Sequence, residues 1–163
     1  MHMHTKLEKA MCMVFVNKKV SATQLQERLK TQGIKANILM SGLEFEERDA
    51  MIDNFRQGVF TTLISTNVLA RGIDVPEVDI VINYDVPMIK HHGFFDPDYA
   101  NFMHRVGRTG RFGTDGLALT LMGNEIDEEH VDLIAKHYDI TIEELESFDQ
   151  LEKIYSEMRQ DVV

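Results

Sequence analysis

The stretch Met11-Cys12-Met13-Val14-Phe15-Val16 is apolar throughout and has the length of a strand. Similar short apolar runs recur, and they predict strands at 12–16, 36–40, 61–65, 79–84 and 117–122, with amphipathic stretches between them. Hydrophobicity that is continuous rather than alternating is typical of parallel strands covered on both faces. The sequence therefore predicts an α/β fold, a doubly wound and mainly parallel sheet with helices on both faces, which binds ligands at the carboxyl ends of its strands.

Capping patterns predict where the helices begin and end. Ser21-Ala22-Thr23-Gln24 is a capping-box pattern that would open the first helix, and Gly33 would end it. Ser41 and Glu44 form a second capping-box pattern, for a helix that Gly58 would stop. Further helices are expected to begin near Asp96-Pro97, Asn124 and Phe148.

Charge is distributed unevenly along the chain. The formal net charge is −10, yet residues 1–124 carry 14 basic and 14 acidic side chains, whereas residues 125–163 carry 3 basic and 13 acidic ones. Phosphate affinity depends on local Lys and Arg, so a neutral body can bind a polyanion beside an acidic tail. The acidic stretch is either a solvated helical face or a surface for a basic protein.

Length and composition predict one domain over residues 1–163, with a partial helix or cloning residues at 1–10 and acidic helices at 125–163. No apolar run is long enough to span a bilayer, and the start lacks a signal-peptide core, which favours a soluble intracellular protein. Cys12 is the only cysteine, which excludes an internal disulfide and a cysteine zinc site. Its apolar neighbours predict a buried thiol.

Polar residues gather where predicted strands end. Ser41-Gly42 would offer backbone N–H groups to a phosphate, with Arg48 one to two turns further on, although a plain helix cap is the alternative. The segment from Ser65 to Pro76 combines a hydroxyl, a guanidinium and a carboxylate with a glycine. This mixture favours a functional loop over a purely structural one.

The segment His104-Arg105-Val106-Gly107-Arg108-Thr109-Gly110-Arg111-Phe112-Gly113 sets three arginines at intervals of three around two glycines. Arg105, Arg108 and Arg111 would line up on one side of a helical turn, and the glycines would let an anion approach. A guanidinium binds phosphate oxygens two at a time, so the row predicts a triphosphate site. The alternative is an arginine-rich surface helix with salt bridges.

Several motifs, in this order, resemble those of the C-terminal RecA-like lobe of DEAD-box RNA helicases. The matching segments are Met13 to Lys19 for motif IV, Thr66 to Pro76 for motif V, Val81 to Pro87 for the segment after it, and His104 to Arg111 for motif VI. Within that family, the loop Met88 to Tyr99, the segment Arg48 to Arg56 and the closing Ile140 to Ile154 are most similar to the mRNA-export helicases of the nuclear pore.

The resemblance implies a RecA-like fold, RNA-stimulated use of ATP with Mg²⁺, and a role for each matched residue. Arg108 and Arg111 would be arginine fingers on the γ-phosphate, and Asp74 would approach the ribose and the attacking water. The other implied residues are Arg71 and His104 linking the nucleotide to the opposite lobe, Gly72 and Phe112 beside the nucleotide, and Asn17, Gly42, Arg48 and Thr66 on RNA phosphates.

The chain also departs from the family pattern. A glutamine is common three residues before the arginine matched to Arg48, where this chain has Phe45. No G-x-x-x-x-G-K-[ST] loop, Asp-Glu-Ala-Asp site or Ser-Ala-Thr motif occurs, and in the family these parts hold Mg²⁺ and the β-phosphate. We therefore expect one half of a two-lobe enzyme, inactive alone, whose Mg²⁺ is held by the other lobe.

Two functions remain open. The chain could be the catalytic lobe described above, or a non-catalytic docking module that binds a nuclear-pore or export factor. In either case the family context places it in the cytoplasm and nucleus, at the nuclear pore.

His91-His92, next to Asp96 and Asp98, could suggest a metal site. Adjacent histidines in a polar loop lack the spacing of metal ligands, so no metal is predicted.

Overall fold

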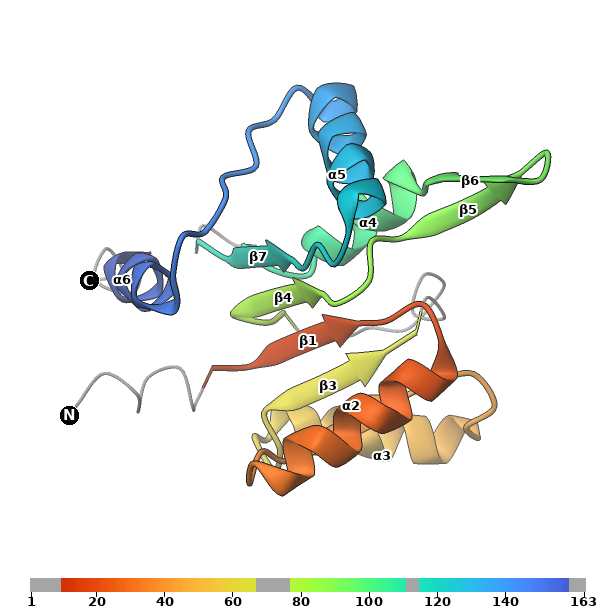
Figure 1. The fold of residues 1–163 in the computed structure, drawn as a ribbon. Helices are drawn as coiled ribbons and strands as arrows, with labels where there is room; N and C mark the ends of the chain where they lie inside the picture. The colour runs from red at the N-terminus through yellow and green to blue at the C-terminus, as the bar shows by residue number, and fades with distance from the viewer. Residues whose placement is uncertain (1–9, 67–76, 111–114, 159–163) are drawn as a thin grey trace.

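A computed structural model describes residues 10–66, 77–110 and 115–158 of the chain. Five parallel strands form the central sheet, in the spatial order β2-β3-β1-β4-β7 (Figure 1). They are β1 (Cys12–Phe15), β2 (Ala36–Leu39), β3 (Thr62–Ser65), β4 (Ile80–Asn83) and β7 (Leu117–Thr120). The predicted doubly wound, parallel sheet is confirmed.

Helices cover both faces of this sheet (Figure 1). Helix α2 (Lys19–Thr31) and helix α6 (Phe148–Met158) pack on one face, against Val14 and Ile80 respectively. Helix α3 (Phe45–Arg56) packs on the other face, where Phe55 contacts the cluster around Met13. Because both faces are covered, the central strands are buried and apolar on both sides, which explains their continuous hydrophobicity.

Helix α4 (Tyr99–Val106) lies on the same face as α3, since its Arg105 guanidinium stands over the Phe15 ring at 5.1 Å. Helix α5 (Glu125–Tyr138) packs against α4, where Val131 and Ile134 join Phe102 in one buried cluster. Among the residues that the structure describes, no helix has the length and apolar character needed to cross a membrane.

Two predicted helix starts are wrong. Helix α2 begins after Lys18, so the Ser21 capping box lies inside its first turn. The Asp85 carboxylate accepts a hydrogen bond from the Asn17 amide at 2.6 Å and thereby fixes the chain just before this earlier start. Helix α3 is capped by Glu44, in a box with Glu47, rather than by Ser41.

The third wrong prediction concerns residues 88–99, which were expected to be a loop leading to a helix near Asp96-Pro97. They form a two-stranded antiparallel hairpin, β5 (Met88–His91) and β6 (Phe94–Pro97), and helix α4 starts later, at an Asp98 cap. His92 and Gly93 make the turn with positive φ angles of 49° and 93°. The sequence did not indicate this hairpin turn, because one of its two positive φ angles is adopted by His92, which is not a glycine.

Candidate nucleotide and RNA site

Arg105 fills the crevice between the carboxyl ends of β1 and β4. The chain turns to opposite sides of the sheet after these two strands, which is where sheets of this class bind ligands. The guanidinium donates to the Asn83 side chain at 3.3 Å, to the Asp85 carbonyl at 2.9 Å and to the Asn17 side chain at 3.1 Å. Arg105 is 1% exposed, so the protein's own cation occupies this crevice.

Burial lowers the pKa of Arg105 to about 10, while the nearby Asp85 and Asp98 carboxylates act in the opposite direction. At neutral pH the side chain is still charged, and its hydrogen bonds compensate for the loss of water. The prediction that Arg105, Arg108 and Arg111 form one row is therefore wrong for Arg105, which points into the protein.

Asn17 shares this network. Its side-chain amide donates to the Val86 carbonyl at 2.8 Å, and its side-chain oxygen accepts from Arg105. Although the residue as a whole is exposed, both ends of its side chain are engaged within the protein. Its predicted contact with RNA therefore has to coexist with a structural role that the sequence did not reveal.

Arg108 lies just beyond the end of α4 and has a different environment. Its carbonyl accepts from the Val78 amide at 3.1 Å, and the adjacent Thr109 hydroxyl donates to the Asp79 carbonyl at 3.2 Å. These bonds fix the backbone of the turn beside the start of β4. The Arg108 side chain is half-buried, and no described residue makes a side-chain hydrogen bond or ion pair with its guanidinium.

Gly116 packs closely against the same turn. A Cβ atom at this position would collide with the Thr109 hydroxyl and with the Gly110 amide nitrogen. Only glycine permits so close an approach between the turn and the entrance to β7. The sequence analysis gave Gly116 no role, although a glycine immediately before a predicted strand can indicate a close approach of two backbone segments.

The predicted RNA residues follow the carboxyl ends of β2 and β3. Thr66 is 6% exposed, and its buried hydroxyl has no hydrogen-bond partner among the described residues. Gly42 is exposed with φ +103°, and no atom lies within 4 Å of the place where its Cβ would be. A ligand oxygen could approach the backbone there without obstruction.

Two cations hold the loop that contains Gly42. The Arg48 guanidinium donates to the Leu43 carbonyl at 3.3 Å, and the Lys19 ammonium donates to the Ser41 carbonyl at 3.4 Å. The sequence analysis assigned Arg48 to this loop but gave Lys19 no role. Together they place two positive charges beside an open backbone turn, which favours a phosphate there.

Of the remaining predicted site residues, only His104 lies within the described part of the chain. His104 is exposed in the last turn of α4, four positions before Arg108. Arg71, Gly72, Asp74, Arg111 and Phe112 lie outside the described residues. Within the described part of the chain, no group of three or more His, Cys, Asp or Glu side chains could hold a metal ion.

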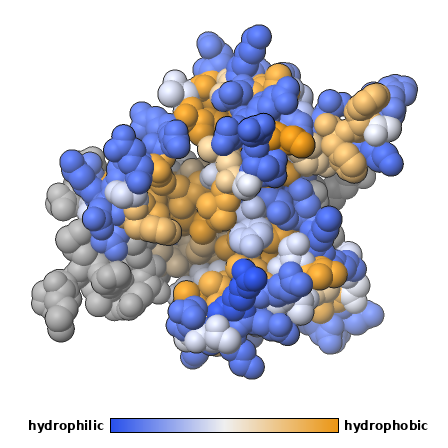
Figure 2. Space-filling model, viewed as in Figure 1, coloured by the Kyte–Doolittle hydropathy of each residue, from blue (hydrophilic) through white to orange (hydrophobic). Residues whose placement is uncertain are grey.

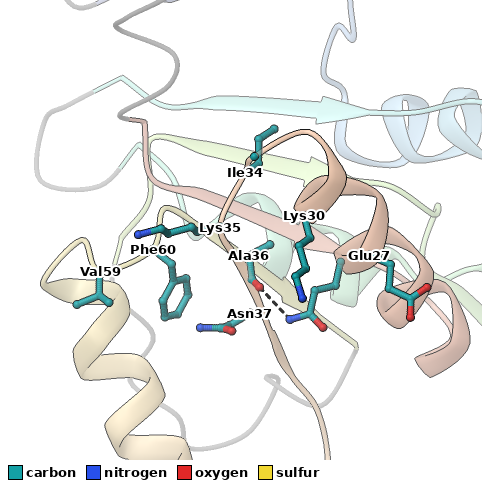
Figure 3. A pocket seen from close by; sticks show the side chains of 10 residues that line it. Glu27, Lys30, Ile34, Lys35, Ala36, Asn37, Val59 and Phe60 are labelled. Carbon is teal, nitrogen blue, oxygen red and sulfur yellow. Dashed lines mark hydrogen bonds between the residues drawn. The ribbon is translucent and has the colours of Figure 1, made fainter.

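A cavity of about 680 Å³ lies elsewhere, at the amino end of β2 (Figure 3). Its lining includes Lys30 and Lys35 as well as Val59 and Phe60. Gln26 also lines it, and its side chain donates to the Ala36 carbonyl at 2.8 Å. The predicted RNA residues follow the opposite ends of the strands. The cavity is therefore separate from the candidate site.

Residues 1–113 match the sequence profile of a family described as the helicase conserved C-terminal domain. The ATP-dependent RNA helicase DBP5 of Lodderomyces elongisporus is 42% identical over 145 residues, which cover 86% of this chain and 28% of that protein. The chain thus spans under a third of the length of this relative.

Solved structures agree with this similarity. The C-terminal domain of the DEAD-box protein Dbp5 superposes with a TM-score of 0.81 at 36% identity, covering 95% of this chain and 87% of that one. Saccharomyces cerevisiae Dbp5 bound to RNA and ADP BeF3 gives a TM-score of 0.82 at 37% identity, covering 96% and 41%. A Dbp5 C-terminal domain bound to Gle1 and IP6 gives 0.78 at 35% identity, covering 98% and 89%.

Proposed function

The chain belongs to the family of helicase conserved C-terminal domains, of the kind found in Dbp5-type DEAD-box helicases, and from this premise we propose that it is the C-terminal lobe of an ATP-dependent RNA helicase. In this role it supplies arginines to ATP and backbone contacts to RNA. The RecA-like fold and the DEAD-box assignment predicted from the sequence are confirmed by the comparisons.

The observation that carries the proposal is the environment of Arg108. Its carbonyl is held by the Val78 amide, and its guanidinium has no partner among the described residues. Gly116 lets the turn that follows Arg108 pack closely against the start of β7. Phosphoryl transfer accumulates charge on the equatorial oxygens of the transferred group. A charged, bidentate donor on a fixed backbone stabilises that charge, and this is the function we assign to Arg108 together with Arg111.

The other predicted residues complete the proposed nucleotide site. Asp74 and Gly72 would lie beside the nucleotide, Phe112 against its base, and Arg71 and His104 between the nucleotide and the opposite lobe. ATP supplies the phosphoryl group, and its Mg²⁺ would be held by that opposite lobe. In such a two-lobe arrangement the opposite lobe would supply the metal-binding carboxylates, and this lobe would supply the arginines that neutralise the charge of the transferred phosphoryl group.

RNA is proposed to lie along the carboxyl ends of β1, β2 and β3. The Thr66 hydroxyl, which no described residue engages, the open Gly42 backbone and the Arg48 guanidinium are suited to phosphate oxygens. These groups read no base edge, so we expect binding that is insensitive to sequence and sensitive to salt.

Export factors are the proposed protein partners. S. cerevisiae Dbp5 structures include complexes with Gle1 and IP6 and with Nup159. Since this chain covers 89% of the Gle1-bound domain, a Gle1-like factor is the partner we propose for this lobe, with nuclear-pore, cytoplasmic and nuclear localisation following from it. A docking module without catalysis is the second candidate, favoured by the same complex.

A chimera tests the proposed function. The chain is fused behind the N-terminal lobe of S. cerevisiae Dbp5 in place of that protein's own C-terminal domain, and RNA-stimulated ATP hydrolysis is measured. We expect hydrolysis, and we expect Arg108→Ala to lower kcat by about 10³-fold. Arg28→Ala is the matched control, because Arg28 is exposed on α2 away from this turn and its loss should leave kcat unchanged.

Equal hydrolysis by the chimera and its Arg108→Ala variant would overturn the catalytic role. The docking module is then tested by calorimetry of the unmodified chain with S. cerevisiae Gle1 and IP6. Binding without any effect of Arg108→Ala on hydrolysis identifies the second candidate as the function.

A further inference from the structure

The β5–β6 hairpin extends from the body of the protein at the carboxyl side of the sheet (Figure 1). Four-residue strands with a rise of about 3.4 Å per residue carry its tip roughly 10–14 Å outward. The tip exposes aromatic rings rather than covering them: Phe94 is 76% exposed and Phe95 is 63% exposed. Apolar surface therefore stands away from the core where folding alone gives no reason for it.

The register places the two rings on opposite faces of the hairpin. Phe95 pairs with Lys90, whose ammonium lies 6.0 Å from the Phe95 ring centre. Phe94 pairs with His91 on the other face, and no described cation covers its ring. The ring of Phe94 is thus an open aromatic surface. Lys90 lies on the opposite face, in the neighbouring cross-strand pair.

Charge distinguishes the hairpin from most of the surface. The tip, residues 90–95, contains Lys90, His91 and His92 and no acidic side chain, in a chain whose net charge is −10; Asp96 is the one acidic side chain of the two strands. In Figure 2 the protruding hairpin shows pale orange surface bordered by blue. A cationic aromatic tip on an acidic protein is complementary to a polyanion that also carries flat rings.

The base of the hairpin is fixed to the candidate RNA site. The Asn17 side chain donates to the Val86 carbonyl at 2.8 Å, and the Asp98 amide closes the base by donating to the Pro87 carbonyl at 2.8 Å. Met88 packs with Val131 beneath it. The carboxyl ends of β1 and β3 and the hairpin lie on the same side of the molecule (Figure 1), so one strand of RNA can reach both.

We propose that the β5–β6 hairpin is a second RNA contact of this lobe, in which Phe94 stacks on an unpaired base on one face and Lys90 binds a phosphate of the same strand on the other face. The inference rests on the proposed RNA-binding function and extends it from phosphates to bases. Stacking is tolerant of sequence, because every base has an aromatic face, so the contact adds affinity without adding a sequence preference.

Binding of a 12-nucleotide single-stranded RNA to the full chain, measured by nuclear magnetic resonance titration, tests the proposal. A second RNA carries three adjacent abasic nucleotides. We expect Phe94→Leu to weaken binding of the intact RNA about tenfold and to abolish the preference for intact over abasic RNA. Lys90→Ala should reduce the slope of log affinity against log salt by about 1, which Phe94→Leu should not do.

Phe148→Leu is the matched control, since Phe148 is 85% exposed at the start of the acidic helix α6 and should have no effect. Unchanged affinity of Phe94→Leu for intact RNA overturns the stacking contact. This holds even if the hairpin proves to bind a protein instead. In that case, shifts of the Thr66 and Arg48 resonances leave the proposed function standing. A wild-type chain with no resonance shifted by RNA overturns both.

Discussion

Arg105 and Arg108 lie three positions apart, in one motif, and the structure gives them opposite environments. Arg105 is buried over Phe15 and donates to three partners in the crevice between β1 and β4. Arg108 follows the helix end, and its guanidinium has no partner among the described residues. The difference teaches that residue type and spacing identify a cation, whereas packing decides whether it serves the fold or a ligand.

The largest effect is expected at Arg105. Arg105→Ala should lower the free energy of unfolding by about 3–5 kcal/mol, because it leaves buried acceptors on Asn17, Asn83 and Asp85 without their donor. Arg108→Ala should change it by less than about 0.5 kcal/mol. Urea unfolding followed by circular dichroism measures both. Similar losses for the two variants would erase the contrast between them.

Gly116→Ala should have the next largest effect. The new methyl group would collide with Thr109 and Gly110, so we expect the free energy of unfolding to fall by about 1–3 kcal/mol and the turn that holds Arg108 to shift. Hydrolysis by the chimera should then fall as well, although no proposed catalytic residue has changed.

Gly123→Ala is the control for that variant. The nearest atom to its Cβ would be an Asp127 oxygen at 3.5 Å, which is ordinary contact, and stability should be unaffected. If Gly116→Ala folded and hydrolysed ATP like the wild type, the turn would not depend on this close approach.

A smaller contrast is expected between Asn17 and Thr66. Asn17→Ala removes the bonds to Val86 and Arg105 and should cost about 1–2 kcal/mol of stability. Thr66→Val removes a buried hydroxyl that has no partner among residues 10–66, 77–110 and 115–158, so stability should be unchanged while RNA binding weakens. Urea unfolding and RNA titration separate the two; a destabilised Thr66→Val with normal RNA binding would reverse the assignment.

Much of the fold could be predicted from the sequence because strand composition is a local property. The runs at 12–16 and 61–65 became β1 and β3, within one or two residues, since continuous apolar sequence fits a sheet covered on both faces. Gly33 and Gly58 follow their helices with positive φ, as predicted, because a left-handed residue ends a helix by its own conformation.

What the sequence could not reveal depends on partners far along the chain. Arg105 is buried where Asn17, just after β1, and Asn83, at the end of β4, accept its hydrogen bonds, and no spacing within the motif indicates this. The start of α2 is set by Asp85, 68 positions from Asn17, rather than by the local Ser21 box. Tertiary contacts therefore overrode the spacing of the arginines in the first case and a local capping signal in the second.

The smallest effect concerns Cys12, which was predicted to be buried and is half-buried on the face of β1 opposite to Arg105; the experiment tests whether water reaches its thiol. Burial raises the pKa of Cys12 from 9.0 to about 12, so the native protein keeps a proton that the unfolded chain releases. This contribution to stability is complete below pH 9 and is lost as the pH rises from 9 towards 12. Between pH 8 and 10, the wild type should lose roughly 1 kcal/mol more than Cys12→Ala. Burial also raises the pKa of Tyr155, which is retained in both proteins, so the difference between their unfolding curves isolates the thiol. Parallel curves would mean that water reaches the Cys12 thiol in the native protein.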